Sequence, residues 1–438
     1  MATQAERCMK VVEDVSTPPG SVPTTSLPLT FFDIQFLGSS PFQRLFFYEF
    51  PHPTSYFMQT TLPSLKTSLS LTLQRFFPFA GNLVFPAPPQ IPYILYTQGD
   101  SVSFFVNEST ADFSHLAGDH ARHFQEFQLI LPKLLPAIAC KTSSGISIGV
   151  SFCHVAGDGR TLAHFMKSWV SIQQSQGDLT CLNNPLPDFS SRDLIEDPLG
   201  LACLFMKRKW SFEDLSNNPI KKLRITCTIK RSQVELLKDL VTKGCVEDNG
   251  SEPVSISTFV VTCAYMWVCL TKLQETTVSQ QISSADDSDE LSYFLFAVDC
   301  RGHLKLPATY FGNCTIARTV AVKRSALMGE NGIVVAGKAI GREVMETYKG
   351  PLKGAEREKF KSRHPPIMVS ASPKFELYKV DFGWGRPRKT EVANIGSLGS
   401  LSLFSIAEGR EEEGSIEFGL ALAPHELDIF NSIFHRTY

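Results

Sequence analysis

Several features that would identify common classes of protein are missing from this chain of 438 residues. The longest apolar run, Phe259 to Leu270, is about a dozen residues long, whereas a membrane-spanning helix needs about 20. Lys and Arg are interspersed with Asp and Glu, and the net charge is -2. Nucleic-acid binding needs concentrated positive charge. We therefore expect neither a membrane nor a nucleic acid as a partner.

Export signals and metal-binding cysteine patterns are also missing. The N-terminal residues MATQAERCMKVVEDV have neither the apolar core of a signal peptide nor the composition of a transit peptide. The 11 cysteines include no Cys-x-x-Cys pair, which is the spacing typical of structural zinc sites. An odd and irregular set of cysteines without an export signal indicates reduced thiols. We expect a cytoplasmic protein without a metal site.

A serine-hydrolase reading has no support. A hydrolase of the α/β type would carry a G-x-S-x-G nucleophile elbow at a turn between a strand and a helix. The match in this chain, GISIG at 145–149, places Ser147 inside the predicted strand Ile146 to Phe152 and not at such a turn.

The pattern of apolar residues indicates a mixed α/β chain. Its length suits two domains, which we place at residues 1–190 and 221–438 with a crossover linker at 191–220. The expected strands are Phe46 to Phe50, Tyr93 to Tyr96, Val102 to Val106, Ile146 to Phe152, Arg224 to Lys230, Tyr293 to Val298 and Ser415 to Leu422. The expected helices are Leu62 to Leu73, one with Leu162, Phe165, Met166 and Trp169 on its apolar face, Ser232 to Val241 and Phe259 to Leu270. Polar loops are expected at Gln281 to Glu290 and Gly409 to Gly414.

One candidate for chemistry is the segment HVAGD, from His154 to Asp158. It follows a predicted strand and precedes a predicted helix, so His154 lies in a turn where a base can reach a substrate. Two other interpretations of the same residues stay open. Asp158 can cap the following helix, which leaves His154 a turn residue, or the pair can ligate a metal.

A second candidate is the glycine-rich loop VDFGWGRP, from Val380 to Pro387. Its glycines surround one tryptophan and indicate a tight, rigid loop, and their spacing is not that of a phosphate-binding loop. The alternative is a buried structural turn.

Taken together and in this order, the two segments resemble the BAHD family of plant acyl-CoA-dependent acyltransferases. HVAGD is similar to the family's HxxxD motif, and DFGWG (Asp381 to Gly385) to its second signature. The resemblance to the branch that acylates anthocyanins and other phenolic glycosides also rests on YFGNC at 310–314, LTFFDIQFL at 29–37 and PFQRLFFYEF at 41–50. ISTFVVTCAYMWVCL at 256–270 and FAVDCRGHL at 296–304 resemble family segments too. The resemblance covers about residues 29–434. One departure is Ser191, where the family usually has an Asp before Arg192, and we expect it to affect only the linker.

The resemblance implies the fold and the reaction. It implies two similar-sized mixed-sheet domains of the chloramphenicol-acetyltransferase-like kind, with a solvent channel between them. An acyl-CoA donor and a phenolic glycoside acceptor would meet at His154, and no metal or organic cofactor would be used. A monomer is expected.

Roles for individual residues follow from the same resemblance. His154 is the expected general base, and the Trp384 indole N–H is a candidate donor to the tetrahedral oxyanion. Asp158 would pair with Arg301 to hold the loop that positions the base. Asp381 would hold the second loop together with Gly383 and Gly385, with a catalytic role as the alternative.

The binding residues are less determined by the pattern. Ser257 and Thr258 match positions near coenzyme A, although both could simply cap a helix. Arg160 could bind the carboxylate of a malonyl donor, which we favour, or could be an ordinary surface residue. A hydroxycinnamoyl donor, a different alcohol or amine acceptor, and a non-catalytic CoA-binding relative remain alternatives.

Overall fold

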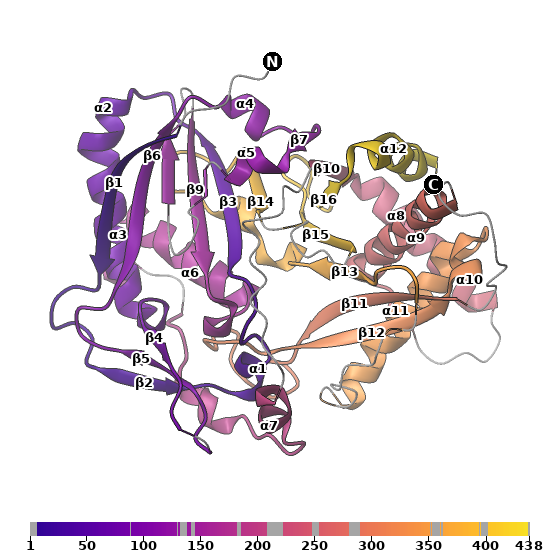
Figure 1. Cartoon of the computed structure of the whole chain (residues 1–438), viewed down its shortest axis with the longest axis horizontal. Coiled ribbons are helices and arrows are strands. Elements are labelled where there is room, and N and C mark those ends of the chain that lie inside the picture. Colours follow the sequence, from indigo (N-terminus) through magenta and orange to yellow (C-terminus); the bar gives the residue numbers. More distant parts are fainter. Residues whose placement is uncertain are drawn as a thin grey trace.

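A computed structural model provides the structure of the chain. It describes all residues except 1–6, 88, 129, 132–137, 142–144, 182–184, 208–221, 248–253, 280–289, 351, 353–359, 361, 394, 396–401 and 437–438. Two large sheets and one small sheet are combined with helices, which confirms the expected α/β class (Figure 1). In the described part of the chain, no helix is both long enough and apolar enough to cross a membrane.

The first large sheet contains the strand that leads to His154. Its order is β1 (Arg7–Ser16), β6 (Ser101–Ser109), β8 (Ile138–Lys141), β9 (Gly145–Phe152), β3 (Phe42–Glu49) and β14 (Lys389–Val392). All residues of β9 are buried, and its Ile146, Ile148 and Val150 join one apolar core with side chains from α3 (Leu62–Arg75) and α6 (Gly159–Gln174). This core fixes the direction in which β9 delivers the turn at its end.

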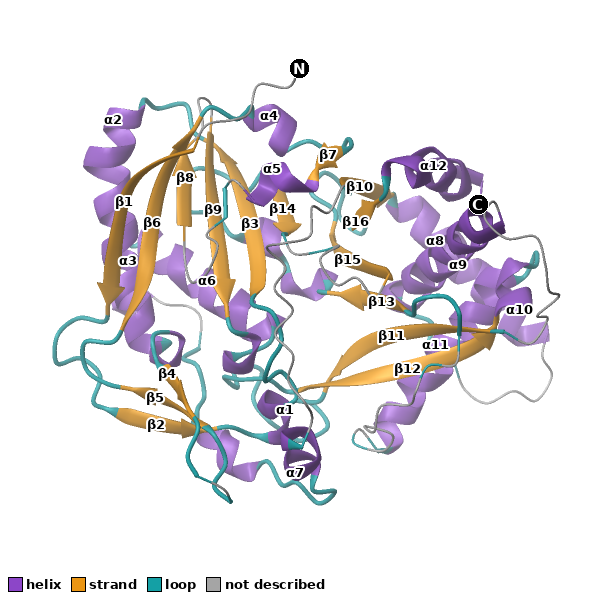
Figure 2. Ribbon diagram, in the orientation of Figure 1, coloured by secondary structure: helices purple, strands orange, loops and turns teal. Residues whose placement is uncertain are grey.

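The helices that pack on the second large sheet lie on the opposite side of the molecule from the first sheet (Figure 2). Its order is β12 (Thr315–Lys323), β11 (Leu291–Asp299), β13 (Ile367–Ser370), β15 (Ser402–Glu408), β16 (Ile416–Leu422), β10 (Leu223–Ile229) and β7 (Arg122–His123). The helices are α8 (Arg231–Glu247), α9 (Thr258–Ser279), α10 (Arg324–Met328), α11 (Gly332–Lys349) and α12 (Leu427–Arg436). Residues 259–270 of α9 are apolar except for Thr262, which suits their burial in a helix packed against α8, α11 and α12.

The two halves of the chain exchange strands. Strand β14 comes from the C-terminal half but pairs with β3 in the first sheet, and β7 comes from the N-terminal half but pairs with β10 in the second. A division at 191–220 therefore fails for these two strands. Of the predicted linker, the described part forms a 3₁₀ turn at Ser190–Leu194 and helix α7 (Leu201–Met206).

A buried ion pair network holds the exchanged strands. Glu391 of β14 accepts hydrogen bonds from Arg122 of β7 and Arg224 of β10, each at 2.7 Å. Burial alone would raise the pKa of Glu391, but the two guanidinium groups hold that pKa at about 2. The carboxylate is thus charged at neutral pH and connects the two sheets.

The remaining elements are short. The small sheet has the order β2 (Thr25–Pro28), β5 (Tyr93–Tyr96), β4 (Asn82–Val84). The short helices are α1 (Phe31–Ile34), α2 (Thr54–Tyr56), a π-helical turn at Phe57–Thr61, α4 (Phe113–Leu116) and α5 (Phe124–Gln128). The strands and helices expected from the sequence all coincide with observed ones, and 409–414 is a turn as expected. Most of the other predicted loop, 281–289, lies outside the described residues.

Candidate active site

The end of β9 delivers His154 into a short turn. The turn is 3₁₀-helical from His154 to Ala156 and leads directly into α6. Close approach of neighbouring atoms explains its two glycines. A Cβ atom on Gly157 would lie 2.8 Å from a methyl carbon of Thr161, and one on Gly159 would lie 2.6 Å from the Phe375 ring. Larger residues would therefore displace the turn that carries His154.

The His154 side chain is half-buried among aromatic rings. The Phe36 ring stacks on the imidazole with centroids 3.9 Å apart and planes 10° apart. Phe42, the first residue of β3, presents its edge at 6.1 Å. These contacts hold the plane of the imidazole while part of the side chain stays accessible to solvent.

Asn313, from the loop between β11 and β12, determines which nitrogen of His154 can act as a base. Its Nδ2 donates to the backbone carbonyl of His154 at 2.8 Å and to Asp33 at 3.0 Å. Because Nδ2 faces these acceptors, Oδ1 is the atom that faces His154 Nδ1, at 3.2 Å. An amide oxygen only accepts, so Nδ1 carries the proton. Nε2 is then the nitrogen with a free lone pair.

Asp33 of α1 supports Asn313 from behind. It is fully buried and accepts hydrogen bonds from the backbone N–H groups of Thr30 at 2.8 Å and Asn313 at 2.9 Å. Arg192 pairs with the same carboxylate at 2.5 Å. The segment around Arg192, expected to be only a linker, thus supports the site. The neighbouring Ser191 binds Asp188 through its backbone N–H.

The environment of His154 favours its neutral form. Burial lowers the pKa of His154 below its usual value, and the smaller opposing effects of Asp158, Asn313 and Asp33 do not reverse this. A lowered pKa leaves the imidazole uncharged at neutral pH. It can therefore accept a proton there.

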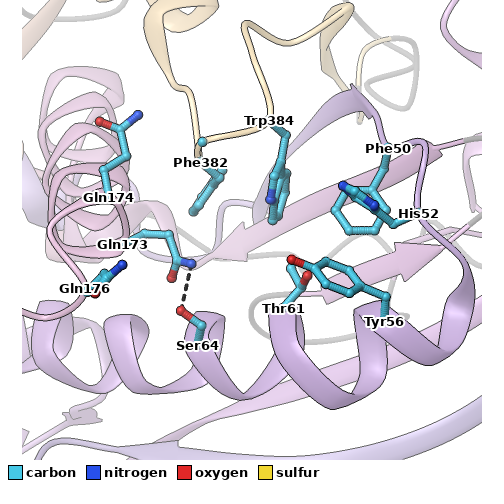
Figure 3. A pocket seen from close by; sticks show the side chains of 11 residues that line it. Phe50, His52, Tyr56, Thr61, Ser64, Gln173, Gln174, Gln176, Phe382 and Trp384 are labelled. Carbon is cyan, nitrogen blue, oxygen red and sulfur yellow. Dashed lines mark hydrogen bonds between the residues drawn. The ribbon is translucent and has the colours of Figure 1, made fainter.

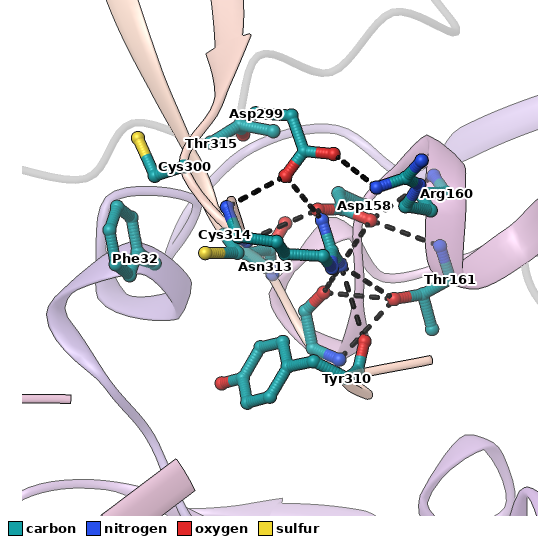
Figure 4. Close-up of polar contacts among 12 residues, drawn as sticks. Phe32, Asp158, Arg160, Thr161, Asp299, Cys300, Tyr310, Asn313, Cys314 and Thr315 are labelled. Atoms are coloured by element: carbon teal, nitrogen blue, oxygen red, sulfur yellow. Dashed lines mark hydrogen bonds and ion pairs between the residues drawn. The ribbon is translucent and has the colours of Figure 1, made fainter. Parts of the chain in front are cut away.

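Asp158 fulfils two of the roles expected from the sequence. It caps α6 by accepting from the backbone N–H groups of Arg160 at 3.1 Å and Thr161 at 3.0 Å. It also accepts two hydrogen bonds from Arg301, at 2.8 and 3.0 Å, and one from the backbone of Cys314 (Figure 4). The cap and the Arg301 pair therefore both exist. Every one of these bonds is directed to the scaffold.

The electrostatics of this buried pair are favourable. Burial alone would raise the pKa of Asp158, but Arg301 and the backbone donors lower it below the usual value. Burial alone would lower the pKa of Arg301, and Asp158 raises it. Both groups are therefore charged at neutral pH. Since Asp158 precedes α6 and Arg301 follows β11, the pair connects the two halves of the chain beside His154.

Arg160 does not point to an empty space. Its guanidinium pairs with Asp299 at 2.8 Å, and the two side chains are 43% and 37% exposed. A carboxylate of a donor would have to compete with Asp299 for this cation. The malonyl-binding role of Arg160 stays a prediction.

Trp384 lies too far from His154 to donate to an oxyanion there. His154 packs on Phe42, at the start of β3, whereas Trp384 packs on Tyr48 and Phe50, at its end and just beyond. Phe42 and Tyr48 are about 20 Å apart at roughly 3.3 Å per residue. The predicted oxyanion role of Trp384 is therefore wrong. The signature residue belongs to a different part of the molecule.

Asp381 is equally remote, and its catalytic alternative is wrong for the same reason. Its carbonyl accepts from Gln174 at the last residue of α6, and His154 lies before the first. At 1.5 Å per residue the helix of 16 residues is about 24 Å long. The Asp381 carboxylate accepts from the backbone N–H groups of Gly383 and Gly385 at 2.8 and 2.9 Å, so it holds the loop. Both glycines have φ near +90°, which other residues rarely adopt.

Ser257 and Thr258 lie at the start of α9. The Ser257 hydroxyl accepts from the backbone N–H of Val260 at 3.3 Å, which is a helix cap. Thr258 is the first residue of the helix. Their predicted contact with coenzyme A stays a prediction.

Sequence reasoning missed Asp33, Asn313 and Phe36 as site residues. All three lie in segments that carry the family resemblance, LTFFDIQFL and YFGNC. Nothing in the local pattern assigns them a role, because they meet His154 only through the tertiary fold.

Comparisons with known proteins identify the family of the chain. The model of a family described as the Transferase family matches residues 11–437. The coumaroyl-CoA:anthocyanidin 3-O-glucoside-6''-O-coumaroyltransferase 1 of Arabidopsis thaliana is 37% identical, with 98% of this chain and 97% of that protein covered. The malonyl-coenzyme A:anthocyanin 3-O-glucoside-6''-O-malonyltransferase of Dahlia pinnata is 34% identical, with 96% and 95% covered.

Solved structures share the fold. Vinorine synthase superposes with a TM-score of 0.64 at 17% identity, covering 97% of this chain and 96% of that one. The F. sporotrichioides TRI101, solved with coenzyme A and T-2, gives a TM-score of 0.67 at 16% identity, covering 93% and 97%. With nearly its whole length matched, the chain belongs to the BAHD family of acyltransferases.

Proposed function

We propose that this protein transfers an acyl group from an acyl-CoA to a sugar hydroxyl of a phenolic glycoside. The observation that carries the proposal is the neutral His154, whose Nδ1–H is bonded to Asn313 and whose Nε2 is free to act as a base. The relatives named above support the substrate class, because their names give anthocyanidin and anthocyanin glucosides as acceptors.

The proposed reaction needs only this base. Nε2 of His154 takes the proton of the acceptor hydroxyl as its oxygen attacks the thioester carbonyl, and a tetrahedral intermediate forms. The C–S bond then breaks, and the leaving thiolate takes the proton back from the imidazolium. A thioester is already activated, so the proposal includes no metal or organic cofactor. Base catalysis of this kind accelerates a reaction typically 10²–10⁴-fold.

The proposal has two versions, which differ in the acyl donor: malonyl-CoA or a hydroxycinnamoyl-CoA. The malonyl donor favoured by the sequence depends on Arg160, which Asp299 already pairs. A hydroxycinnamoyl donor is the second candidate, because its ring would suit the aromatic surroundings that Phe36 and Phe42 provide at His154. Arg160→Ala should weaken malonyl-CoA selectively if the first version holds. Equal loss with acetyl-CoA would reject a carboxylate contact.

A donor-by-acceptor assay tests the proposal. Purified protein is mixed with malonyl-CoA, acetyl-CoA or coumaroyl-CoA and with flavonoid or simple phenolic glucosides, and CoA release and acylated product are followed. We expect acceptor-dependent CoA release with matching product from at least one pair. Release without product, or none with any pair, would contradict the proposal. Light scattering would test the proposed monomer, and a fluorescent fusion the proposed cytoplasmic location.

A further inference from the structure

A cavity lies at the ends of β3 and α6 that are opposite to His154. Its volume is about 450 Å³, which is within the range of small-molecule sites. The DFGWG loop, the C-terminal end of α6 and the π-helical turn at Phe57–Thr61 surround it. Single π-helical turns occur frequently at functional sites. The proposed acyl transfer uses none of these elements.

Aromatic rings form one part of the cavity wall. Figure 3 shows Trp384 between Phe382 and Phe50, with Tyr56 and His52 on one side and the glutamines of α6 on the other. The Trp384 ring is fixed by edge-on contacts with Tyr48 and Phe50, both at 5.5 Å between centroids. Fixed aromatic faces are surfaces on which polarised C–H groups of a ligand can pack.

Several hydrogen-bonding groups at the cavity have no partner among the described residues. The Thr61 hydroxyl is one of them, although its residue is only 6% exposed. The Trp384 indole N–H, the Tyr56 hydroxyl and the Gln176 amide also bond to no described residue. By contrast, Gln173 is occupied by Ser64 and Ser68 and acts as part of the frame. Polar groups without a protein partner on a cavity wall are available to exchange hydrogen bonds with a ligand or water.

The cavity wall has no permanently charged side chain, because none of the lining residues is Lys, Arg, Asp or Glu. A phosphate or carboxylate would find no permanent cation there to compensate its loss of water. The phosphates of coenzyme A and the carboxylate of a malonyl group are therefore unsuitable occupants. A ligand with several neutral hydroxyls and an apolar ring face is suitable.

From these groups we infer that the cavity binds the sugar ring of a neutral glycoside, at a site separate from the one at His154. The aromatic faces pack against the C–H face of the ring. Thr61, Tyr56, Gln176 and Trp384 exchange hydrogen bonds with its hydroxyls. The inference rests on the proposed function only for the identity of the glycoside, since that function would supply the same class of molecule as acceptor.

Equilibrium binding tests the inference without any acyl donor. Phenyl β-D-glucopyranoside is titrated into the full chain while tryptophan fluorescence is recorded. Trp169 and Trp267 are 1% and 0% exposed, so Trp384 is the described tryptophan that the sugar can reach. We expect a saturable change that Trp384→Phe removes. An unchanged signal in that variant would place the binding elsewhere and overturn the inference.

Isosteric variants separate the site from folding effects and from the active site. Thr61→Val and Tyr56→Phe remove one hydroxyl each, and each should weaken the glucoside about threefold to tenfold. Tyr348→Phe, at an exposed tyrosine in α11 (67%, against 43% for Tyr56), is the matched control and should bind as the wild type does. If Thr61→Val and Tyr56→Phe both bind with wild-type affinity, the cavity is not the site. Failure of the acyl-transfer assay would leave this binding result intact, so the two proposals fail separately.

Discussion

His154 and Trp384 belong to the two signature segments of the chain, and they lie at opposite ends of the same strand, β3, and the same helix, α6. At the His154 end, α1, the β9–α6 turn and the β11–β12 loop bring together residues from both halves of the chain. At the Trp384 end, Gly383 and Gly385 donate to the Asp381 carboxylate within the loop, and Gln174 and Tyr48 donate to backbone carbonyls of Asp381 and Val380.

A sequence motif alone does not show whether its residues are catalytic. Both segments are compact and rich in glycine, and either could be read as catalytic. Only the first receives partners that orient a base, because Asn313 and Asp33 reach it from other parts of the chain. The second shapes a loop and a cavity wall. Reactivity depends on these distant partners, which a local sequence pattern does not contain.

The largest expected loss of activity is at the His154 end. His154→Ala should reduce kcat by about 10²–10⁴-fold, because the acceptor hydroxyl loses its base. The measurement is steady-state turnover with the best donor and acceptor. His425→Ala, an exposed histidine, is the matched control and should keep full activity. A His154→Ala enzyme within threefold of wild type would contradict the assignment.

Removing the buried guanidinium of Arg301, near His154, should affect stability as well as activity. Arg301→Ala leaves the Asp158 carboxylate buried without its countercharge, so the free energy of unfolding should fall by about 3–5 kcal/mol. Denaturant titration measures this change. The exposed pair of Arg388 and Glu49 provides a contrast, because Arg388→Ala should cost about 0–1 kcal/mol. Equal losses in the two variants would show that the Asp158 pair is not a stabilising link.

A smaller effect is expected for the residue that orients the base. Asn313→Ala removes the acceptor for His154 Nδ1–H, so the imidazole loses its fixed tautomer, and kcat should fall roughly tenfold to a hundredfold. KM for the acyl-CoA should change little, since Asn313 bonds only to the scaffold. A rise in KM with kcat unchanged would instead assign Asn313 to substrate binding.

The smallest effect on catalysis is expected at the Trp384 end. Trp384→Phe keeps an aromatic ring against Tyr48 and Phe50 but removes the indole N–H. Because the ring lies far from His154, kcat should stay within about threefold of wild type. Loss of an oxyanion donor would instead cost about 10²–10³-fold. A loss of that size would show that Trp384 takes part in catalysis.

The sequence predicted most helices and strands but not the exchange of strands between the two large sheets. Residues 146–152 alternate in the way of a strand, and the apolar run 259–270 is too long for a strand, so both elements were predictable. The exchange of β7 and β14 between the sheets was not, because both strands are short and depend on the buried charges of Glu391, Arg122 and Arg224. Asp158 was predicted correctly as a partner of Arg301 through the family resemblance. Trp384 was misplaced, because a motif gives no distance to a base.

The most direct test of His154 as the base uses the unaltered protein and varies only pH. The neutral imidazole is the active form, so kcat/KM should fall as acidification protonates it. Burial lowers its pKa, and the acidic limb of the profile should therefore lie below the usual value of about 6.5. Circular dichroism over the same range confirms that the protein stays folded. A midpoint below 6.5 is the result this account predicts, whereas a rate that stays constant until the protein unfolds, or a midpoint well above 6.5, would contradict it.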